Sequence, residues 1–311
     1  MPASDSSIFT DADGYQASLR DLLDLLVLRP RDFHARLTWV EFLHLHLLYA
    51  EEAGSRLAYV TLPQEQVFII FPTRRDSLLI AGGTELPFGA IMFHNPGSRF
   101  HQRTTAACHW GSISLSAESL RYFSRIIAGR ELAPPTTSRV LRPHRAPLQR
   151  LLRLHATARR IAETSQRRIT NDQVVRAMDQ DLIWALIGCL TTAEKETGRQ
   201  QISLSVQLEA LLEGHPCRLL LTKDVCDALG VSEQTLRATC MRVLGMSPGR
   251  YQRLRRLKLV RSELRQAKPG TVDVAAVMER YGFSSLHRFV AEYWDAYGEV
   301  PPIPARIGAS R

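Results

Sequence analysis

Hydrophobic and polar positions follow two different periods along this chain. Between residues 37 and 115, short apolar runs alternate with turn signals such as Gly82-Gly83 and Asn95-Pro96-Gly97. Runs and turns at this spacing predict the strands of a small β-barrel or sandwich. From about Pro147 onward, apolar residues recur every three or four positions, which predicts helices. The sequence therefore predicts a β-rich N-terminal region followed by a helical region.

Two amphipathic helices are expected directly after the strands. The first spans about 147–164, and the second follows Thr170, which can form a capping box with Gln173. Leu182 and Leu186 lie in the apolar stripe of the second helix. Because these apolar faces lie beyond the expected barrel, we predict that the two helices form a homodimer interface containing Leu182 and Leu186.

The last hundred residues contain a repeated pattern. A short helix is expected to stop at Gly230, which can adopt the left-handed conformation, and Ser232 is a good N-cap for the next helix. In the second copy a helix is expected to stop at Gly282, and Ser284 occupies the matching cap position 52 residues after Ser232. The pattern predicts two helix-turn-helix units, each of which would place its second helix in a DNA major groove.

A basic helix is expected between the two units, over about 248–267. Pro248 suits its first turn, and Glu263 is the single acid among its charged residues. Twenty helical residues measure roughly 30 Å, which is close to the ~34 Å of one turn of B-DNA. Such a spacer could hold two recognition helices in successive major grooves. The basic residues in and directly after it are Arg250, Arg253, Arg255, Arg256, Lys258, Arg261, Arg265 and Lys268.

Two stretches of this region closely resemble the DNA-binding domain of the AraC/XylS family of bacterial transcription regulators. They are ALGVSEQTLRATCMRVLGMSPGRYQRLRRLKLVRSEL and YGFSSLHRFVAEYWDAYGEVPP. The matching motifs are GxS before the first recognition helix, GxSP at the start of the connecting helix, GFSS before the second recognition helix, and a final aromatic helix ending in YG and prolines. Cys226 and Met278 stand where the family usually has a small alanine, and the bulkier Met278 predicts looser packing of the second unit.

The resemblance implies which residues contact DNA. By position, the family's base-facing sites fall on Gln234, Arg237, Ala238, Leu286, His287 and Arg288. Basic side chains and helix N-termini are expected to contact phosphates, and these are Ser232, Arg242, Arg250, Arg253, Arg256 and Ser284. The expected units span about 222–243 and 271–297, with recognition helices at about 233–243 and 285–297.

The family commonly joins this DNA reader to an N-terminal cupin-type barrel followed by dimerising helices, and PFGAIMFHNPGSRFH loosely resembles a segment of such barrels. The expected fold is therefore multidomain α+β, with a cupin-like sensing β-barrel, a helical dimerisation segment and an all-α domain that contains the two helix-turn-helix units. The expected boundaries are 1–142, 143–202 and 203–311. The resemblance also implies contact with RNA polymerase, activation of transcription and an unidentified small-molecule effector.

Composition and charge are compatible with a DNA-binding protein. Hydrophobic residues make up 45% of the chain and charged residues 23%, as in ordinary soluble proteins. The formal net charge of +9 favours a polyanionic partner. The first residues are polar and acidic, so we expect no secretory signal; no run of about eighteen apolar residues occurs, and the five cysteines form no CxxC pair. We therefore expect a cytoplasmic protein with reduced thiols and no membrane association, and the family resemblance implies a bacterial one.

Enzyme functions remain as alternatives. His44 and His46, with Glu51 after them, have the HxH…E spacing of metal-binding cupins, and the two histidines would share a strand face, although the family's flanking glycines are missing. Pro216-Cys217-Arg218 resembles the PCHR motif of DNA-repairing alkyltransferases but lacks its histidine. We expect no catalytic residue, metal or cofactor. The alternative is a metal-dependent cupin enzyme or a DNA-repair protein that uses the C-terminal domain as a DNA tether.

A third possible function is a helical protein-interaction module that makes no contact with DNA. Helix-turn-helix hairpins containing glycine also occur in ordinary all-α cores, so one such unit alone would be weak support for DNA binding. Two units in tandem, joined by a one-sidedly basic helix, favour DNA binding over this alternative.

Overall fold

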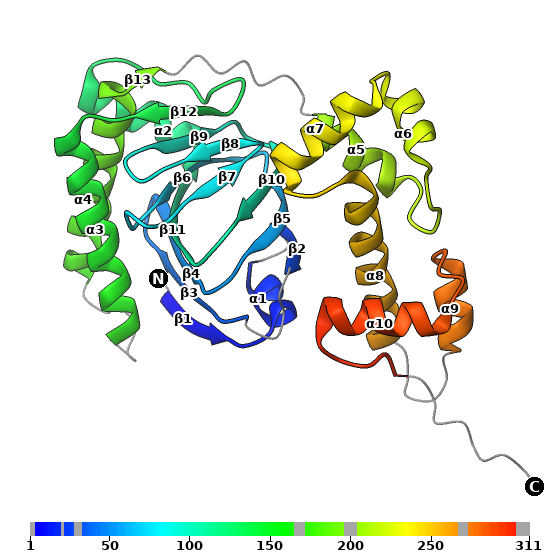
Figure 1. The fold of residues 1–311 in the computed structure, drawn as a ribbon. Helices are drawn as coiled ribbons and strands as arrows, with labels where there is room; N and C mark the ends of the chain where they lie inside the picture. Colours follow the sequence, from blue (N-terminus) through cyan, green and yellow to red (C-terminus); the bar gives the residue numbers. More distant parts are fainter. Residues whose placement is uncertain are drawn as a thin grey trace, which may run out of the picture. The chain divides into compact units, whose positions relative to one another are not determined.

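The computed structural model describes residues 4–19, 22–27, 33–164, 172–195, 204–266 and 273–302. The chain divides into two compact units, one formed by residues 1–25 and 33–201 and the other by residues 26–32 and 202–311. The first unit is rich in β-strands and the second is helical (Figure 1). The predicted order of a β-rich region and a helical region is confirmed.

The strands of the first unit form two sheets. Eight strands lie in the order β1-β3-β4-β11-β6-β9-β12-β13, and five lie in the order β2-β5-β10-β7-β8. The expected closed cupin-like barrel stays a prediction, because the hydrogen-bonded pairs describe two sheets. The strands are β1 Ser4–Phe9, β2 Leu23–Val27, β3 Ala35–Glu41, β4 Leu45–Glu52, β5 Arg56–Thr61, β6 Gln66–Pro72, β7 Leu79–Ala81, β8 Thr84–Leu86, β9 Ile91–His94, β10 Arg99–Thr104, β11 Cys108–Ser116, β12 Arg139–Arg142 and β13 Glu194–Lys195.

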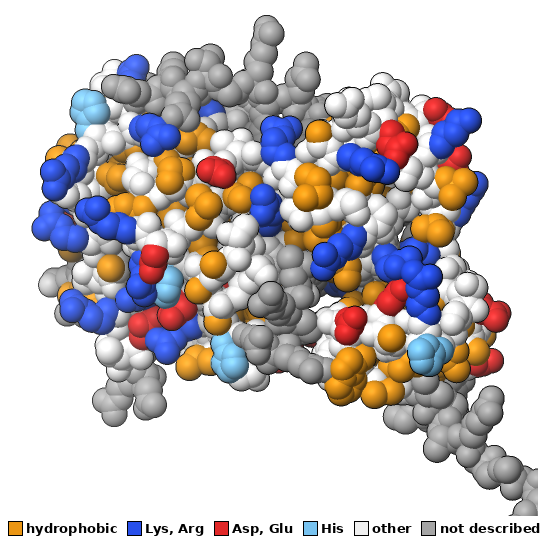
Figure 2. All heavy atoms as spheres, viewed as in Figure 1, with side chains coloured by type: hydrophobic (Ala, Val, Ile, Leu, Met, Phe, Trp, Pro, Cys, Tyr) orange, Lys and Arg blue, Asp and Glu red, His pale blue; other side chains and the backbone are white. Residues whose placement is uncertain are grey.

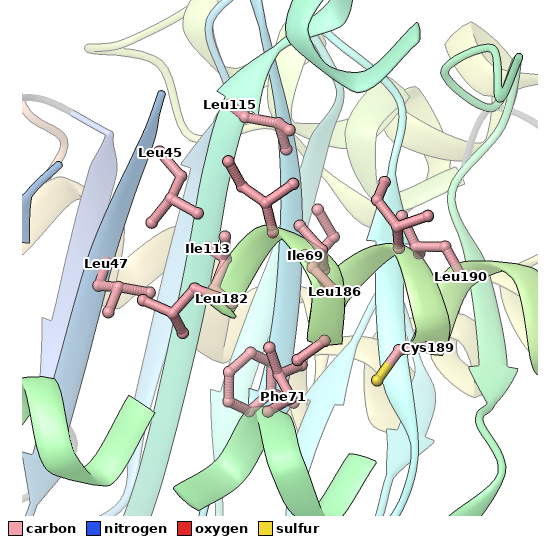
Figure 3. Close-up of a cluster of buried hydrophobic side chains, with 14 of the residues drawn as sticks. Leu45, Leu47, Ile69, Phe71, Ile113, Leu115, Leu182, Leu186, Cys189 and Leu190 are labelled. Carbon is pink, nitrogen blue, oxygen red and sulfur yellow. The ribbon is translucent and has the colours of Figure 1, made fainter. Parts of the chain in front are cut away.

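Strand β11 lies between β4 and β6 in the larger sheet, and the side chains of these strands alternate between its two faces. On one face, Ile69 and Ile113 belong to a buried apolar cluster that also contains Leu182 and Leu186 (Figure 3). On the other face, Trp110 lines a cavity. The larger sheet is therefore covered by helices on one face and borders a cavity on the other.

Three helices pack against the apolar face of the larger sheet and against one another. They are α2 (Ala117–Ala128), α3 (Arg145–Thr164) and α4 (Asp172–Thr192), while the short α1 (Ala12–Ser18) packs beside β1. A close approach occurs at Gly111 in β11, where a Cβ atom would lie 2.7 Å from the ring of His155 in α3. Glycine is needed there because any side chain would overlap the imidazole.

The apolar face of α4 packs against the larger sheet of the same chain. Leu182 and Leu186 are fully buried against the sheet, so they belong to the core of the first unit and not to an exposed dimer interface, which corrects their assignment. Periodicity identified an apolar face but not what covers it. Trp184 lies on the outer face of α4 and is 53% exposed. The predicted capping box at Thr170 lies outside the described residues.

The second unit is helical, and its last three helices pack around a small core that includes Leu257, Val260, Phe289 and Tyr293. Among the described residues, no helix is both long enough and apolar enough to cross a membrane. The helices of this unit are α5 Leu204–Glu213, α6 Thr222–Leu229, α7 Glu233–Leu244, α8 Pro248–Gln266, α9 Val274–Arg280 and α10 Leu286–Tyr297.

Candidate nucleic-acid interface

Helices α6 and α7 form the first helix pair. Gly230 ends α6 in the left-handed conformation with φ +65°, and Ser232 begins α7 by accepting a hydrogen bond from the Thr235 amide at 3.1 Å. Leu236 and Cys240 are buried one turn apart, which fixes the inner face of α7. Ser232 therefore occupies the cap position that the sequence predicted.

The outer face of α7 carries the side chains expected to reach bases. Gln234, Arg237 and Ala238 are all exposed, and Met241 extends the same stripe by one further turn. Arg237 Nη2 lies 2.6 Å from a carboxylate oxygen of Glu233 on the same helix. An exposed pair of this kind is weak, so the guanidinium can exchange this partner for another acceptor.

Helices α9 and α10 form the second helix pair, and its cap differs from the prediction. Ser285, not Ser284, begins α10, with its hydroxyl oxygen accepting a hydrogen bond from the Arg288 amide at 3.4 Å. Gly282 adopts φ +76°, as expected of a turn glycine. From this glycine to the cap the second turn is one residue longer than the first, so matching the two glycines placed the cap one residue too early.

The corrected cap changes which residues of the two pairs correspond. Leu236 and Cys240 of α7 match Phe289 and Tyr293 of α10, and all four are buried. Both helices also end at a left-handed glycine, Gly245 in α7 and Gly298 in α10. Equivalent positions after the turn are therefore 53 residues apart, not 52.

The exposed face of α10 follows from this correspondence. Leu286, His287 and Arg288 are exposed in its first turn, as the sequence predicted for base-contacting residues. His287 is the equivalent of Gln234, and Trp294 is the equivalent of Met241. Trp294 is 44% exposed and was missed, because its position on the outer face becomes apparent only when Ser285 is recognised as the cap.

Basic side chains of α7 and α8 differ in their surroundings. Arg242, Arg250 and Arg253 are exposed, as expected for phosphate contacts, and Arg253 Nη1 lies 3.1 Å from a carboxylate oxygen of Glu292. Other arginines of α8 form ion pairs within the unit, such as Arg255 with Glu209 at 2.6 Å. On the face shown in Figure 2, acidic side chains lie among the basic ones over the helical unit.

The structure corrects one of the predicted phosphate contacts, that of Arg256. Its side chain is 6% exposed, its Nη1 donates a hydrogen bond to the Tyr281 carbonyl at 2.8 Å, and its guanidinium lies 5.1 Å from the centre of the Phe283 ring. These contacts hold the second turn against α8. Arg256 is therefore part of the interior of the unit, because the residues that cover it come from a segment about 25 positions later in the chain.

Comparison with known proteins agrees with this geometry. Residues 225–302 match the family model described as "Helix-turn-helix domain". They are an AraC-type helix-turn-helix domain. The chain is also 31% identical, over 90 residues, to the "Probable thc operon regulatory protein" of Rhodococcus erythropolis. That match covers 29% of this chain and 27% of the relative.

Two solved structures resemble longer parts of the chain at low identity. The AraC-like transcriptional activator CuxR is 14% identical with a TM-score of 0.46, and the alignment covers 84% of this chain and 95% of CuxR. An apo form of ToxT from Vibrio cholerae is 9% identical with a TM-score of 0.37, covering 83% of this chain and 96% of ToxT.

An apolar cavity of about 290 Å³ lies in the first unit, bordered by residues of both sheets. Trp39 and Trp110 contribute aromatic walls, and Ser112 contributes a hydroxyl group from β11. The wall also contains Gln102, whose amide oxygen accepts a hydrogen bond from the buried Arg56 at 2.8 Å. A cavity that is mostly apolar with a few polar groups is typical of small-ligand sites.

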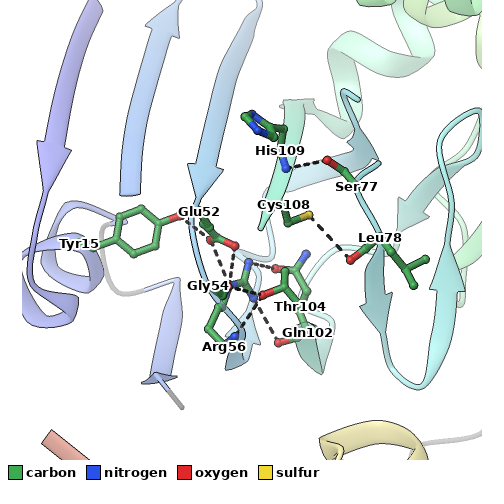
Figure 4. A network of polar contacts seen from close by, with 10 residues as sticks. All are labelled: Tyr15, Glu52, Gly54, Arg56, Ser77, Leu78, Gln102, Thr104, Cys108 and His109. Atoms are coloured by element: carbon green, nitrogen blue, oxygen red, sulfur yellow. Dashed lines mark hydrogen bonds and ion pairs between the residues drawn. The ribbon is translucent and has the colours of Figure 1, made fainter. Parts of the chain in front are cut away.

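The side chain of Arg56 is held by a buried network (Figure 4). Its Nε donates to both carboxylate oxygens of Glu52 at 3.0 Å, and the hydroxyl of Tyr15 donates to the same carboxylate at 2.7 Å. Burial first, and then the Glu52 charge, raises the pKa of Tyr15 well above its ordinary value. The network thus keeps the guanidinium behind Gln102 in a fixed place.

The histidines of the HxH pattern do not form a ligand set. His44 lies before β4, where its Nδ1 is 2.6 Å from a carboxylate oxygen of Asp179. His46 lines the apolar cavity, whereas Glu51 lines a different cavity beneath α3. The expectation that His44 and His46 share a strand face is therefore wrong, because β4 begins only at Leu45.

Proposed function

We propose that this protein is a sequence-specific DNA-binding transcription regulator whose α7 and α10 read two successive major grooves. The observation that carries the proposal is the equivalence of these helices: each has a serine cap, a buried inner stripe, an exposed outer face and a glycine end. Helix α8 joins the two pairs and spans 19 residues, roughly 28 Å at 1.5 Å per residue. That length suits one turn of DNA.

Within the proposal, bases are contacted by Gln234, Arg237, Ala238, Leu286, His287 and Arg288. The exposed Arg242, Arg250 and Arg253, with the helix N-termini at Ser232 and Ser285, contact phosphates and set the register on the duplex. Arg256 acts indirectly, by holding the second turn in place. Ala238 and Leu286 contribute apolar contacts, such as those to a thymine methyl group.

The proposal extends to the rest of the chain. The segments 1–142, 143–202 and 203–311 serve as sensing, dimerisation and DNA-binding parts, in a protein of the bacterial cytoplasm that activates transcription through RNA polymerase. The apolar cavity supports an effector site, and the exposed Trp184 on the outer face of α4 supports a homodimer interface there. No catalytic step is assigned to the chain.

The central test compares two arginines on two DNAs. After selection of a bound sequence from genomic fragments, Arg237→Ala and Arg253→Ala are titrated on that operator and on random DNA at several salt concentrations. Arg237→Ala should cost about 1–3 kcal/mol on the operator and much less on random DNA, because a base-reading arginine loses its partner only where the base is present. Arg253→Ala should weaken both by similar factors and reduce the salt slope by roughly one unit.

Arg150→Ala provides the matched control, since Arg150 is an exposed arginine of α3 in the other unit. It should leave both affinities unchanged. Equal losses on operator and random DNA for Arg237→Ala would contradict base reading by α7. Failure of the folded wild-type protein to bind any genomic duplex at low salt would overturn the whole proposal.

A further inference from the structure

A second cavity, of about 260 Å³, lies between the larger sheet and helix α3. Strands β4 and β11 contribute Tyr49, Glu51 and His109, and Thr73 and Arg74 follow β6. Arg159 of α3 also lines the cavity, and its guanidinium lies 4.3 Å from the centre of the Tyr49 ring. This cavity lies under the helix-covered face, whereas the apolar cavity borders the other face of the same sheet.

The side chains under α3 change character along the sheet. On β4, the helix-facing positions Leu45 and Leu47 belong to the apolar core, but the next two positions on that face are Tyr49 and Glu51. Burying polar groups beneath a helix costs free energy unless they find partners. At its polar end, this face of the sheet therefore borders a cavity that the side chains of the apolar core do not fill.

His155 fixes the helix at the edge of this cavity. Its Nε2 donates a hydrogen bond to the Leu48 carbonyl at 3.1 Å, and the ring packs directly against Gly111. Burial lowers the pKa of His155 to about 4, so the ring is neutral at physiological pH. The distance between α3 and the sheet is set by this contact, which makes the cavity a preformed one.

Several residues that line the cavity have hydrogen-bonding groups whose partners within the described residues are incomplete. An arginine only donates, so the 3.4 Å contact from Arg74 Nη1 makes His109 Nε2 the acceptor, and His109 Nδ1 then donates to the Tyr49 oxygen at 2.7 Å. The Tyr49 hydroxyl proton is left to donate elsewhere. Among the described residues, the buried Thr73 Oγ1 and Arg159 Nε have no hydrogen-bond partner.

The charges around the cavity select among ligands. Burial lowers the pKa of His109, so the positive charges are those of Arg74 and Arg159. Each already lies near a carboxylate, since Arg74 Nη2 is 3.0 Å from Asp76 and Arg159 Nε is 3.9 Å from Glu163. Glu51 adds a negative charge to the wall, which would repel a phosphate dianion but can accept a hydrogen bond from an amino or hydroxyl group.

We propose that this cavity binds a small carboxylate that carries an amino or hydroxyl group beside it, such as an amino acid or a hydroxy acid. The guanidinium groups of Arg74 and Arg159 and the hydroxyls of Thr73 and Tyr49 hold the carboxylate. Glu51 accepts the neighbouring donor group. This site is separate from the apolar cavity, and the inference does not depend on DNA binding.

The experiment is calorimetric titration of the full-length protein with single amino acids and hydroxy acids, with the matching unsubstituted carboxylates, and with inorganic phosphate. A ligand of the proposed class should bind, and its unsubstituted counterpart should bind at least several-fold more weakly. Arg74→Gln should weaken binding by about tenfold or more, as expected for loss of a hydrogen bond to a charged group. Thr73→Val keeps the side-chain shape and should weaken binding several-fold.

Two control variants locate the ligand. Arg75→Gln removes the neighbouring arginine, which does not line this cavity, and Ser112→Ala alters the apolar cavity. Both should leave the affinity unchanged. The proposal is overturned if no amino or hydroxy acid binds at millimolar concentration, if phosphate binds more tightly than every carboxylate, or if Ser112→Ala abolishes binding while Arg74→Gln does not.

Discussion

The two helix pairs of the second unit have matching helices but different turns. Helices α7 and α10 have equal length and end at equivalent glycines, yet the turn before α10 contains one more residue. Equivalent buried residues of the two pairs are 52 positions apart before the turn, as for Val225 and Val277, and 53 positions apart after it. Tandem copies of a motif can therefore keep their packing while their turns diverge, and the caps define the register.

The turns also differ in what surrounds them. A Cβ atom on Gly230 would meet nothing within 4 Å, whereas one on Gly282 would lie 2.9 Å from Arg256 Nη1. Helices α6 and α7 pack on α5, but the turn before α10 is held by a side chain of α8. The first turn is thus determined locally, and the second depends on a distant residue.

The largest expected effect comes from removing that residue. Arg256→Ala leaves the Tyr281 carbonyl without its donor and removes the cation above Phe283, which should destabilise the second pair by about 3 kcal/mol. Hydrogen exchange of the full-length protein should show faster exchange in α9 and α10, with α6 and α7 nearly unchanged. Arg250→Ala, at an exposed position near the start of the same helix, serves as control. An equal loss of protection from hydrogen exchange in both helix pairs would refute the idea that only the second turn depends on Arg256.

A smaller effect is expected from the turn glycines themselves. Alanine in the left-handed conformation costs about 1 kcal/mol, which should be the whole cost of Gly230→Ala. Gly282→Ala should cost about 2 kcal/mol because the new methyl group also displaces Arg256. Thermal unfolding of both variants measures the difference. A cost for Gly230→Ala that equals or exceeds that of Gly282→Ala would argue against the close approach of Arg256.

The serine caps provide a third comparison. Ser232→Ala and Ser285→Ala should each cost about 1 kcal/mol, since each hydroxyl accepts a backbone hydrogen bond at a helix start. Ser284→Ala should cost close to nothing. Chemical denaturation of the three variants tests the corrected register. A larger loss of stability for Ser284→Ala than for Ser285→Ala would instead support Ser284 as the cap, 52 residues after Ser232.

The smallest expected effect is on DNA affinity, from removing the acidic residues that form ion pairs with the exposed arginines. Glu292 pairs with both Arg253 and Arg288, whereas Glu233 pairs with Arg237. Because exposed pairs are worth up to about 1 kcal/mol, Glu292→Gln should raise affinity for DNA a few-fold and Glu233→Gln by less. Electrophoretic mobility shifts at fixed salt measure both. No gain with either variant would indicate that these arginines do not contact DNA.

Features that depend on neighbours in the sequence could be predicted, and those that depend on distant contacts could not. A glycine followed by a serine marks a helix end and a helix start through local backbone geometry, which is why Gly230 and Ser232 were identified. Ser284 and Ser285 are equally good caps, and the choice depends on how Phe283 enters the core. Likewise, the spacing of Leu182 and Leu186 indicates an apolar face but cannot identify the sheet that covers it.

The chain contains four tryptophans, and their places have a practical consequence. Trp39 and Trp110 line the apolar cavity, while Trp184 and Trp294 are exposed on α4 and α10. The apolar cavity, the outer face of α4 and the outer face of α10, which are proposed to bind an effector, a second copy and a duplex, therefore each carry their own fluorophore. Since indole emission shifts with the polarity around the ring, single Trp→Phe variants would allow the three binding events to be followed optically in the unlabelled protein.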